Sequence, residues 1–305
     1  MLIAVTGATG FVGRYIVNHL IEQGHRCRCW FRPESDRGGF IDDDAIDWMR
    51  GELNDQAASD QLVEGVDAMV HAGLDRSNWK NDIADDFLGC VETNTIGSIR
   101  LIQSAKRAGV GRFVFISTCA VHEFVMDDRK LDEAHPLWPR WHYGAYKAAV
   151  EKFVHSFGLG REFPVCALRP TGVYGVTRPI ENSKWFDIVR DVAAGKPIRS
   201  EAGGKEVHAA DVARAVDVLL NAPMESITGQ AFNCYDMYVA DQDVAGIAKL
   251  ITGSKSEIIP LNTGPKNQID TSKIRSLGMT FGGIPLLEGT VKLLLNPDSR
   301  IVDLR

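Results

Sequence analysis

The sequence of 305 residues predicts an α/β fold with a Rossmann-type, doubly wound parallel sheet. Three observations support this prediction. Short β-branched apolar runs alternate with longer segments of helical periodicity, a glycine-rich turn follows the first run, and the regular alternation ends near Arg169. We interpret the irregular segments after this point as a smaller, interleaved α/β cap over the carboxyl edge of the sheet, where open α/β folds bind ligands.

Each expected strand is a short apolar run between turn signals. The runs lie at residues 2–6, 26–31, 67–71, 112–117, 164–169 and 230–234, with a weaker run at 46–49. Residues 11–23, 93–108 and 143–157 carry apolar side chains at helical spacing and are therefore expected to cross between strands. Later helical patterns lie within 179–197 and at 211–220, 242–251 and 286–295.

Composition excludes several classes of protein. The 34 basic and 40 acidic side chains leave a net charge of -6, which argues against a nucleic-acid-binding surface. No apolar run approaches the roughly 20 residues that a membrane span needs, and the apolar start lacks the basic region of a signal peptide. The six cysteines show no metal-binding spacing, so we expect free, mostly buried thiols in a cytoplasmic protein.

The turn TGATGFVG at residues 6–13 indicates a dinucleotide-binding site. Gly7 permits a tight turn, Gly10 lets the backbone approach a pyrophosphate, and Gly13 lets helix and strand pack closely. The amide groups and dipole of the following helix favour a diphosphate at this place. The alternative, three glycines that merely end a strand, is disfavoured because the turn lies between an expected strand and helix.

The end of the second expected strand indicates which cofactor is bound. An acidic side chain at this place suits the ribose of NAD, whereas an arginine suits the 2′-phosphate of NADP. The chain has Arg32 here, with Arg37 nearby and Arg14 just after the glycine turn. The site therefore takes NAD or NADP, and Arg32 favours NADP; the alternative is that these arginines are ordinary solvated charges.

Tyr143 and Lys147 are four residues apart on an expected helix and therefore share one face. An ammonium group close to a phenol lowers the phenol's pKa, so Tyr143 could exchange a proton with a substrate oxygen. Thr118, after the strand at 112–117, would offer a hydroxyl to the same oxygen. Tyr146 is a rival, but the residue four positions later is Val150, which cannot tune it. An incidental surface pair remains the alternative for Tyr143 and Lys147.

Together these motifs resemble the extended short-chain dehydrogenase/reductase family, the NAD-dependent epimerase/dehydratase group. The resemblance extends over nearly the whole chain, with the motifs in order. It rests on TGATGFVG (6–13), GELND (51–55), VHAG (70–73), Asn94, FVFIST (113–118), YGAYK (143–147), LRPTGVYG (168–175), VHAADVA (207–213) and DTSK (270–273).

The resemblance implies roles for individual residues. The catalytic residues would be Tyr143, Lys147, Thr118 and Asn94. The cofactor would be bound by Gly7, Thr9, Gly10, Phe11, Val12, Gly13, Arg32, Glu52, Leu53, His71, Ala72, Gly73, Ser117, Tyr143, Lys147 and Pro170. Residues 1–170 plus about 205–236 would form the NAD(P)-binding domain, and about 171–204 and 237–305 the cap. A homodimer through a four-helix bundle of the helices at 93–108 and 143–157 is also implied.

Three departures from the family pattern bear on the substrate. Cys119 and Ala120 stand where the family's dehydratases have an Asp-Glu pair. We therefore do not expect this chain to catalyse 4,6-dehydration. Gly172 stands where nucleotide-sugar enzymes carry an asparagine, and Gly204 where they carry a phosphate-binding arginine. Lys205 could substitute for that arginine, but only as a point charge.

The leading hypothesis is hydride transfer to or from a small polar, sugar-like alcohol or ketone. The alternatives are a nucleotide-sugar epimerase with tightly bound NAD(P) and, ranked lower, a non-catalytic cofactor-sensing protein. Trp141, His142, Arg178 and Trp185 are candidate substrate residues, although the tryptophans could equally pack the cap and Arg178 could be a surface charge. The histidines show no metal-ligand spacing, so no catalytic metal is expected.

Overall fold

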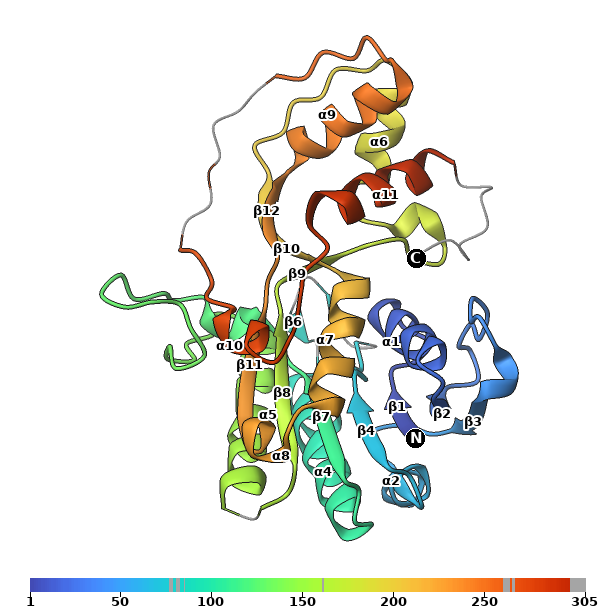
Figure 1. The fold of residues 1–305 in the computed structure, drawn as a ribbon, viewed down its shortest axis with the longest axis vertical. Coiled ribbons are helices and arrows are strands. Elements are labelled where there is room, and N and C mark those ends of the chain that lie inside the picture. The colour runs from blue at the N-terminus through green and yellow to red at the C-terminus, as the bar shows by residue number, and fades with distance from the viewer. Residues whose placement is uncertain are drawn as a thin grey trace.

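The computed structural model describes residues 1–76, 79–80, 83–84, 86–160, 162–259, 264 and 267–296. Within them, seven parallel strands form the main sheet in the order β11-β8-β7-β4-β1-β2-β3. This order grows outward from β1 in both directions and makes the sheet doubly wound, which confirms the predicted fold class. The sheet fills the lower part of the molecule in Figure 1.

The strands of the main sheet are β1 (Leu2–Thr6), β2 (Arg26–Phe31), β3 (Ile46–Arg50), β4 (Ala68–His71), β7 (Arg112–Ile116), β8 (Val165–Pro170) and β11 (Gln230–Cys234). The helices that pack on it are α1 (Phe11–Glu22), α2 (Gln56–Val63), α4 (Gly97–Arg107), α5 (His142–Leu159) and α7 (Ala209–Asn221). Every strand therefore lies within a residue or two of its predicted place.

Two apolar layers hold these helices on opposite faces of the sheet. Alternate strand residues such as Ile3 and Val5 face α1 and α7, and both are fully buried. The residue between them, Ala4, faces the layer formed by α2, α4 and α5. Because side chains alternate across a strand, two-sided burial requires nearly continuous apolar runs, and these runs made the strands recognisable in the sequence.

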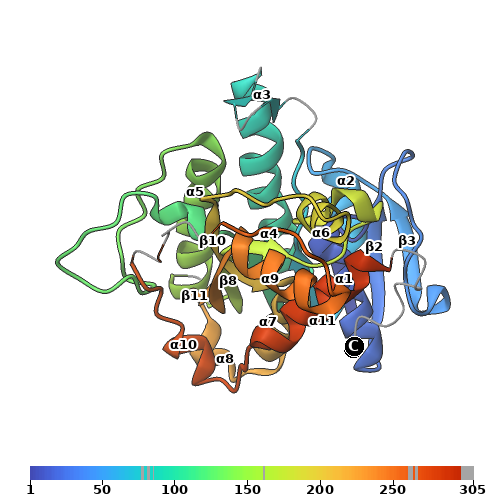
Figure 2. The same ribbon diagram turned by 90° about the horizontal axis from the view of Figure 1, so that it is seen from above.

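The helix expected at 93–108 begins earlier and is not uniform. A short helix α3 (Phe87–Cys90) leads into the π-helical segment η2 (Val91–Ile96), and α4 follows without a break. Asn94 lies in the wide turn of η2 and is buried. In Figure 2, α3 projects beyond the body of the protein, at the end of the layer that contains α4.

A smaller sheet carries the cap, at the top of Figure 1. Its order is β12-β10-β9, with β9 (Gly172–Tyr174) parallel and β12 (Met237–Ala240) antiparallel to β10 (Gly203–His208). The helices α6 (Phe186–Ala193), α9 (Asp241–Thr252) and α11 (Gly283–Leu295) share one apolar core with this sheet. Residues 205–208, expected with the NAD(P)-binding domain, thus pair within the cap sheet.

The remaining short elements are β5 (Trp79–Lys80), β6 (Ile83–Ala84), η1 (Asp43–Ala45), η3 (Cys119–His122), η4 (Ile180–Asn182), α8 (Met224–Ile227) and α10 (Ser272–Arg275). In the described part of the chain, no helix has the length and apolar character needed to cross a membrane. All six cysteines are free, and five of them are buried.

Candidate functional site

The turn between β1 and α1 forms a cradle in which two glycines are sterically required. Gly7 has a φ of 72°, and a Cβ on it would lie 2.6 Å from the carbonyl oxygen of Ala72. A Cβ on Gly13 would overlap the carbonyl oxygen of Gly7. Gly10 is less constrained, because its Cβ would meet only Gly7 O, at 3.1 Å. The glycine spacing therefore brings α1 directly against β1 and β4.

The first turn of α1 is suited to an anion. Gly10 is the exposed N-cap, no side chain of the described residues caps the helix, and its first turn holds no acidic residue. Free amide groups at a helix start, together with the helix dipole, favour a diphosphate. Thr9, Phe11 and Val12 are all partly exposed around this turn. The residues present therefore fit the dinucleotide that the motif predicts.

Two arginines lie at the carboxyl end of β2. The guanidinium of Arg32 pairs with Glu34 at 3.1 Å and with Asp75 at 3.5 Å, and 52% of its side chain is exposed. Arg37 lies over the ring of Phe31, at 4.6 Å from its centroid. Both arginines are thus close to the place where the sequence predicts the adenosine ribose.

Arg14 has a different role from Arg32 and Arg37. It donates to the backbone oxygens of Gly38 and Asp36, at 3.0 and 2.6 Å, and its side chain is only 12% exposed. Burial lowers the pKa of its guanidinium. Arg14 therefore holds the loop after β2 against α1.

The amino-terminal turn of α5 packs directly on the segment that follows β7. A Cβ on Gly144 would lie 2.5 Å from the carbonyl oxygen of Ala120, so only glycine allows this approach. Tyr143 is half-buried next to it. The contact places the turn that carries Tyr143 beside η3, which Thr118 caps by accepting a hydrogen bond from Ala120 N at 3.1 Å.

Lys147 is buried one turn after Tyr143. Its Nζ donates to the carbonyl oxygen of Ile116 at 2.5 Å and lies 4.6 Å from the centroid of the Phe115 ring. Burial lowers the pKa of Lys147 to about 7, while the carboxylate of Glu151 opposes this shift. The ammonium group is therefore fixed at the carboxyl end of β7, on the same helix face as Tyr143.

The two tyrosines of α5 have different surroundings. Tyr146 is 5% exposed, and burial raises the pKa of its phenol well above the usual value. The ring of Tyr143 lies 5.9 Å from that of Tyr146, and the guanidinium of Arg76 lies over it at 5.7 Å. Tyr146 also has a cation over its ring, Lys147 Nζ at 5.1 Å from the centroid, so the two phenols differ chiefly in burial. Tyr143 is the less buried of the two, in keeping with the expectation that it acts as the acid or base.

His71 and Asn94, expected at the cofactor and catalytic sites, take part in a buried chain of hydrogen bonds. His71 Nδ1 lies 2.7 Å from Thr6 Oγ1, and its Nε2 lies 2.8 Å from Ser98 Oγ. Ser98 in turn donates to the carbonyl oxygen of Asn94 at 2.5 Å. Burial lowers the pKa of His71 to about 3, so the imidazole is neutral. Its side chain joins β1, β4 and α4.

The amide of Asn94 fixes the loop after β4. Its Oδ1 accepts from Asp75 N at 2.8 Å, and its Nδ2 donates to Asp75 O at 3.0 Å. Nearby, Gly73 N donates to Thr6 Oγ1 at 3.1 Å. The wide π-helical turn at Asn94 therefore serves to shape the loop that leads from β4 towards Arg76.

Other expected cofactor residues lie along the carboxyl edge of the main sheet. Leu53 is buried, with its carbonyl oxygen 2.6 Å from the place of a Cβ on Gly97, whereas Glu52 is exposed. Pro170 is the buried last residue of β8. Ser117 is buried as well, and its hydroxyl donates to Glu151.

A buried ion pair that sequence reasoning missed lies behind the site. Arg169, at the end of β8, binds both carboxylate oxygens of Glu151, with contacts of 2.6 to 3.1 Å. Its NH1 also lies 3.1 Å from His122 Nε2. Burial lowers the pKa of His122 to about 4. The spacing of four residues places Glu151 on the same face of α5 as Lys147, but no sequence signal indicates Arg169 as its partner.

The four candidate substrate residues do not form one cluster. Trp141 is 48% exposed at the start of α5, and the ring of the exposed His142 lies tilted against that of Phe87, at 4.6 Å between ring centroids. Trp185 is 8% exposed within the cap core, and its Nε1 donates to Asp241 at 3.0 Å. Arg178 pairs with Asp36 at 3.0 Å.

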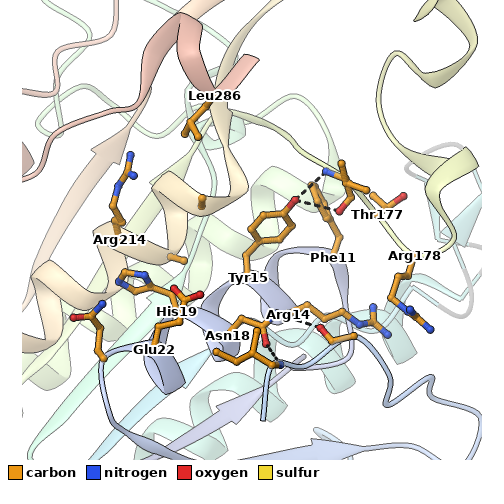
Figure 3. Close-up of a pocket in the computed structure, with 16 residues that line it drawn as sticks. Phe11, Arg14, Tyr15, Asn18, His19, Glu22, Thr177, Arg178, Arg214 and Leu286 are labelled. Carbon is orange, nitrogen blue, oxygen red and sulfur yellow. Dashed lines mark hydrogen bonds between the residues drawn. The ribbon is translucent and has the colours of Figure 1, made fainter. Parts of the chain in front are cut away.

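Arg178 borders a separate cavity of about 240 Å³ between α1, α7 and the cap (Figure 3). Tyr15 forms part of its wall, and the Tyr15 hydroxyl accepts a hydrogen bond from Val176 N at 2.9 Å. Tyr143, Lys147 and Thr118 do not line this cavity. Its lining residues are Phe11, Arg14, Tyr15, Asn18, His19, Glu22, Gln23, Gly39, Ile41, Val176, Thr177, Arg178, Ala210, Ala213, Arg214 and Leu286.

A Rossmann sheet with a glycine cradle and a Tyr-Lys pair on α5 defines the class of dinucleotide-binding short-chain enzymes. Residues 3–234 match the NAD dependent epimerase/dehydratase family, and the chain belongs to this family. The predicted family is therefore confirmed.

Two curated relatives show how far the similarity extends. A putative dihydroflavonol 4-reductase from Synechocystis sp. is 33% identical over 47% of this chain and 40% of its own length. A dTDP-glucose 4,6-dehydratase from Streptomyces antibioticus is 30% identical over 57% of this chain and 54% of its own. The chain thus spans about half the length of the curated relatives it matches.

Solved structures share the whole fold. A UDP-glucose 4-epimerase from Thermus thermophilus in complex with NAD has a TM-score of 0.76, with 21% identity over 97% of this chain and 99% of that one. A dTDP-glucose 4,6-dehydratase from Streptomyces venezuelae with NAD bound has a TM-score of 0.77, with 22% identity and full coverage of both chains.

Proposed function

We propose that this protein is an NAD(P)-dependent oxidoreductase that transfers hydride to or from a small polar, sugar-like alcohol or ketone. The observation that carries the proposal is the buried Lys147, held by Ile116 O one helical turn from Tyr143. A buried ammonium at this place has no evident structural advantage, because burial penalises its charged form. Its position suits the tuning of a neighbouring phenol.

A bound dinucleotide would supply or accept the hydride. Tyr143 would give a proton to, or take one from, the substrate oxygen, and the ammonium of Lys147 would favour the phenolate form. Thr118 would orient the same oxygen, since its hydroxyl proton stays available while its Oγ1 caps η3. The cradle at Gly7 and Gly13 would hold the diphosphate.

We further propose that NADP is preferred over NAD. Arg32 and Arg37 place two guanidinium groups at the end of β2, and a 2′-phosphate would compete with Glu34 for Arg32. Arginine suits this role because its planar fork binds phosphate oxygens in pairs. The NAD bound in the two solved relatives described above is a property of those proteins.

Two alternative functions share the fold. A nucleotide-sugar epimerase would use the same residues but regenerate its bound cofactor, and a cofactor-sensing protein would bind NAD(P) without turnover. The names of the relatives include both a reductase and a nucleotide-sugar dehydratase. The substrate would reach Tyr143 past the exposed Trp141 and His142.

The decisive experiment measures NADPH oxidation by the purified protein with carbonyl probes, including a dihydroflavonol and simple keto sugars. We expect stoichiometric consumption of added NADPH. Turnover of UDP-glucose without added cofactor, by protein that already carries NAD(P), would instead establish the epimerase. Cofactor binding with no turnover of any probe would support the sensing protein.

We also propose a homodimer through the faces of η2, α4 and α5. Ile96 and Phe153 are apolar side chains with 39% and 41% of their surface exposed, on segments that pack together. Light scattering after size exclusion should give twice the chain mass of 33.6 kDa. The double variant Ile96→Glu, Phe153→Glu should give the single mass, whereas a monomeric wild-type protein would contradict the dimer.

The division of the chain that we propose keeps 1–170 plus about 205–236 for the dinucleotide and about 171–204 and 237–305 for the substrate, except that residues 205–208 of β10 pair within the cap sheet and lie on the substrate side. The two separate cores, one around the main sheet and one in the cap, support it. Six free cysteines suit a reducing compartment and support the proposed cytoplasmic location.

A further inference from the structure

A carboxylate with an unused acceptor is buried in the cap. Glu206 lies on β10 and is 2% exposed. Its Oε1 binds the ammonium of Lys184. Its Oε2 is buried and has no hydrogen-bond partner among the described residues. An ionised carboxylate normally satisfies both oxygens when it is removed from water, so Oε2 is a candidate acceptor for a ligand.

Two glycines make room for this carboxylate. A Cβ on Gly172 would lie 2.7 Å from Glu206 Oε2 and 2.9 Å from Oε1. A Cβ on Gly204 would overlap Glu206 Oε1. Gly172 is the partner of Glu206 across β9 and β10, and Gly204 is two residues earlier on the same strand face. Any larger side chain at either place would displace the carboxylate.

Exposed groups border the buried carboxylate. Gly172 is exposed beside the buried carboxylate, and 39% of the Lys184 side chain is exposed. Lys184 Nζ also lies over the ring of Trp185, at 5.0 Å from the centroid. On the same sheet face, Tyr174 is fully buried, and its hydroxyl has no partner among the described residues. A second unused polar group therefore lies on this face.

Charge decides which ligand this place can take. A phosphate next to Oε2 would put two like charges in a partly desolvated site, which is unfavourable. A hydroxyl group can instead donate to Oε2 and accept from Lys184. The ammonium group of Lys205 does not offset the repulsion between phosphate and Glu206. Successive residues of β10 point to opposite faces of the sheet, so Lys205 and Glu206 lie on different faces.

We propose that Glu206 and Lys184 form a substrate subsite that binds the hydroxyl groups of an uncharged polyol and rejects phosphate-bearing substrates. The inference rests on the proposed oxidoreductase function and narrows its substrate class. The carboxylate of Glu206 fills the space that any side chain at Gly172 or Gly204 would need.

The test compares two ligands that differ only in the phosphate. Glucose and glucose 1-phosphate are titrated into the NADP-loaded protein by ligand-detected NMR, with UDP-glucose as a third probe. We expect glucose to bind at least about tenfold more tightly than either phosphorylated probe. Tighter binding of UDP-glucose than of glucose, or no binding of glucose, would overturn the proposal without any variant.

The isosteric variant Glu206→Gln removes the charge while keeping the shape. We expect the ratio of the dissociation constants of glucose 1-phosphate and glucose to fall by about tenfold or more. The matched control is Asp187→Asn on α6, whose side chain is 79% exposed, and it should leave the ratio unchanged. An unchanged ratio in Glu206→Gln, with cofactor binding intact, would overturn the proposal.

These measurements need no turnover, so their failure is separable from failure of the proposed function. If the protein oxidises or reduces no alcohol or ketone, but glucose binds more tightly than glucose 1-phosphate, the subsite is supported and the oxidoreductase function is contradicted. If turnover depends on Tyr143 but UDP-glucose binds more tightly than glucose, the oxidoreductase stands and the subsite does not.

Discussion

Glu151 binds Arg169 through both carboxylate oxygens in the interior of the protein, one helical turn beyond Lys147. The pair joins α5 to the end of β8, and the hydroxyl of Ser117 joins it to the end of β7. Three elements that carry candidate site residues therefore meet at one buried charge pair. We infer that it fixes the position of Lys147 relative to Thr118.

The first prediction concerns this ion pair. Glu151→Gln leaves the Arg169 guanidinium buried without its counter-charge, so the free energy of unfolding should fall by about 3–5 kcal/mol. Urea unfolding followed by circular dichroism measures the change. The control, Asp128→Asn, removes the partner of Arg129 in an exposed pair and should have no measurable effect. Equal effects of the two variants would contradict the structural role of the buried pair.

The second prediction separates the two tyrosines of α5. Tyr143→Phe should lower kcat/KM by about 10²–10⁴-fold, because it removes the proton donor, and should leave NADPH binding unchanged. The matched variant Tyr146→Phe removes a hydroxyl from a buried ring on the same helix and should retain most activity. Steady-state kinetics and NADPH fluorescence measure both quantities. A larger loss in Tyr146→Phe would reverse the assignment.

The third prediction follows from the lowered pKa of Lys147, about 7 against 10.5 in an unfolded chain. Below pH 7 both states carry the proton, so the folded state bears the full cost of burying the charge; the cost falls as pH rises from 7 to 10.5. Lys147→Met should therefore stabilise the fold more at pH 6 than at pH 10.

Thermal unfolding at both pH values, for Lys147→Met and for the exposed control Lys152→Met, checks this difference. The loss of the hydrogen bond to Ile116 O lowers stability at both pH values, so the sign of the difference between them rests on the shifted pKa. The prediction fails if the stability change of Lys147→Met is the same at pH 6 and pH 10.

The fourth prediction concerns the glycine cradle. Gly13→Ala places a methyl group against Gly7 O, so it should lower stability by about 1–3 kcal/mol or more and weaken NADPH binding. Gly246 in α9 has open space around its Cβ position, so Gly246→Ala should stabilise by about 0.5–1 kcal/mol. Thermal unfolding should therefore show a lower melting temperature for Gly13→Ala and a higher one for Gly246→Ala. A Gly13→Ala protein that binds NADPH normally would contradict the proposed role of the glycine cradle.

The fifth prediction addresses cofactor choice. Arg32→Ala should raise the Kd of NADPH by about tenfold or more and leave that of NADH nearly unchanged, because only NADPH carries the 2′-phosphate. Arg26→Ala, an exposed arginine at the other end of β2, is the control. If Arg32→Ala weakens the binding of NADPH and NADH equally, Arg32 does not recognise the 2′-phosphate.

Local sequence patterns predicted most of the fold. The predicted bounds of strands 2–6 and 230–234 agree with the structure at both ends. A strand that is buried on both faces needs a nearly continuous apolar run, which is easily recognised in the sequence. The start of the helix expected at 93–108 differs from the structure, because α3 and η2 extend the helix back to Phe87. A π-helical turn changes the periodicity locally, and the sequence pattern does not show where it begins.

Candidate site residues were recognisable where chemistry follows from spacing along one element. Tyr143 and Lys147 share a helix face, and Gly7 and Gly13 share a turn, so their relation is local. The roles of Glu151 and Arg169 could not be predicted in this way, because the two residues are separated by 18 positions and meet only when β8 packs against α5.

The sequence by itself determined the parallel sheet, the glycine cradle and the tyrosine–lysine pair, because each follows from periodicity or spacing within a short segment. Only the tertiary structure decided that Trp185 packs in the cap core, that His71 is a neutral, fully bonded side chain, and that Glu206 lies between Gly172 and Gly204. These are relations between segments distant in sequence. Burial and the approach of facing strands create them, and neither exists before the chain has folded.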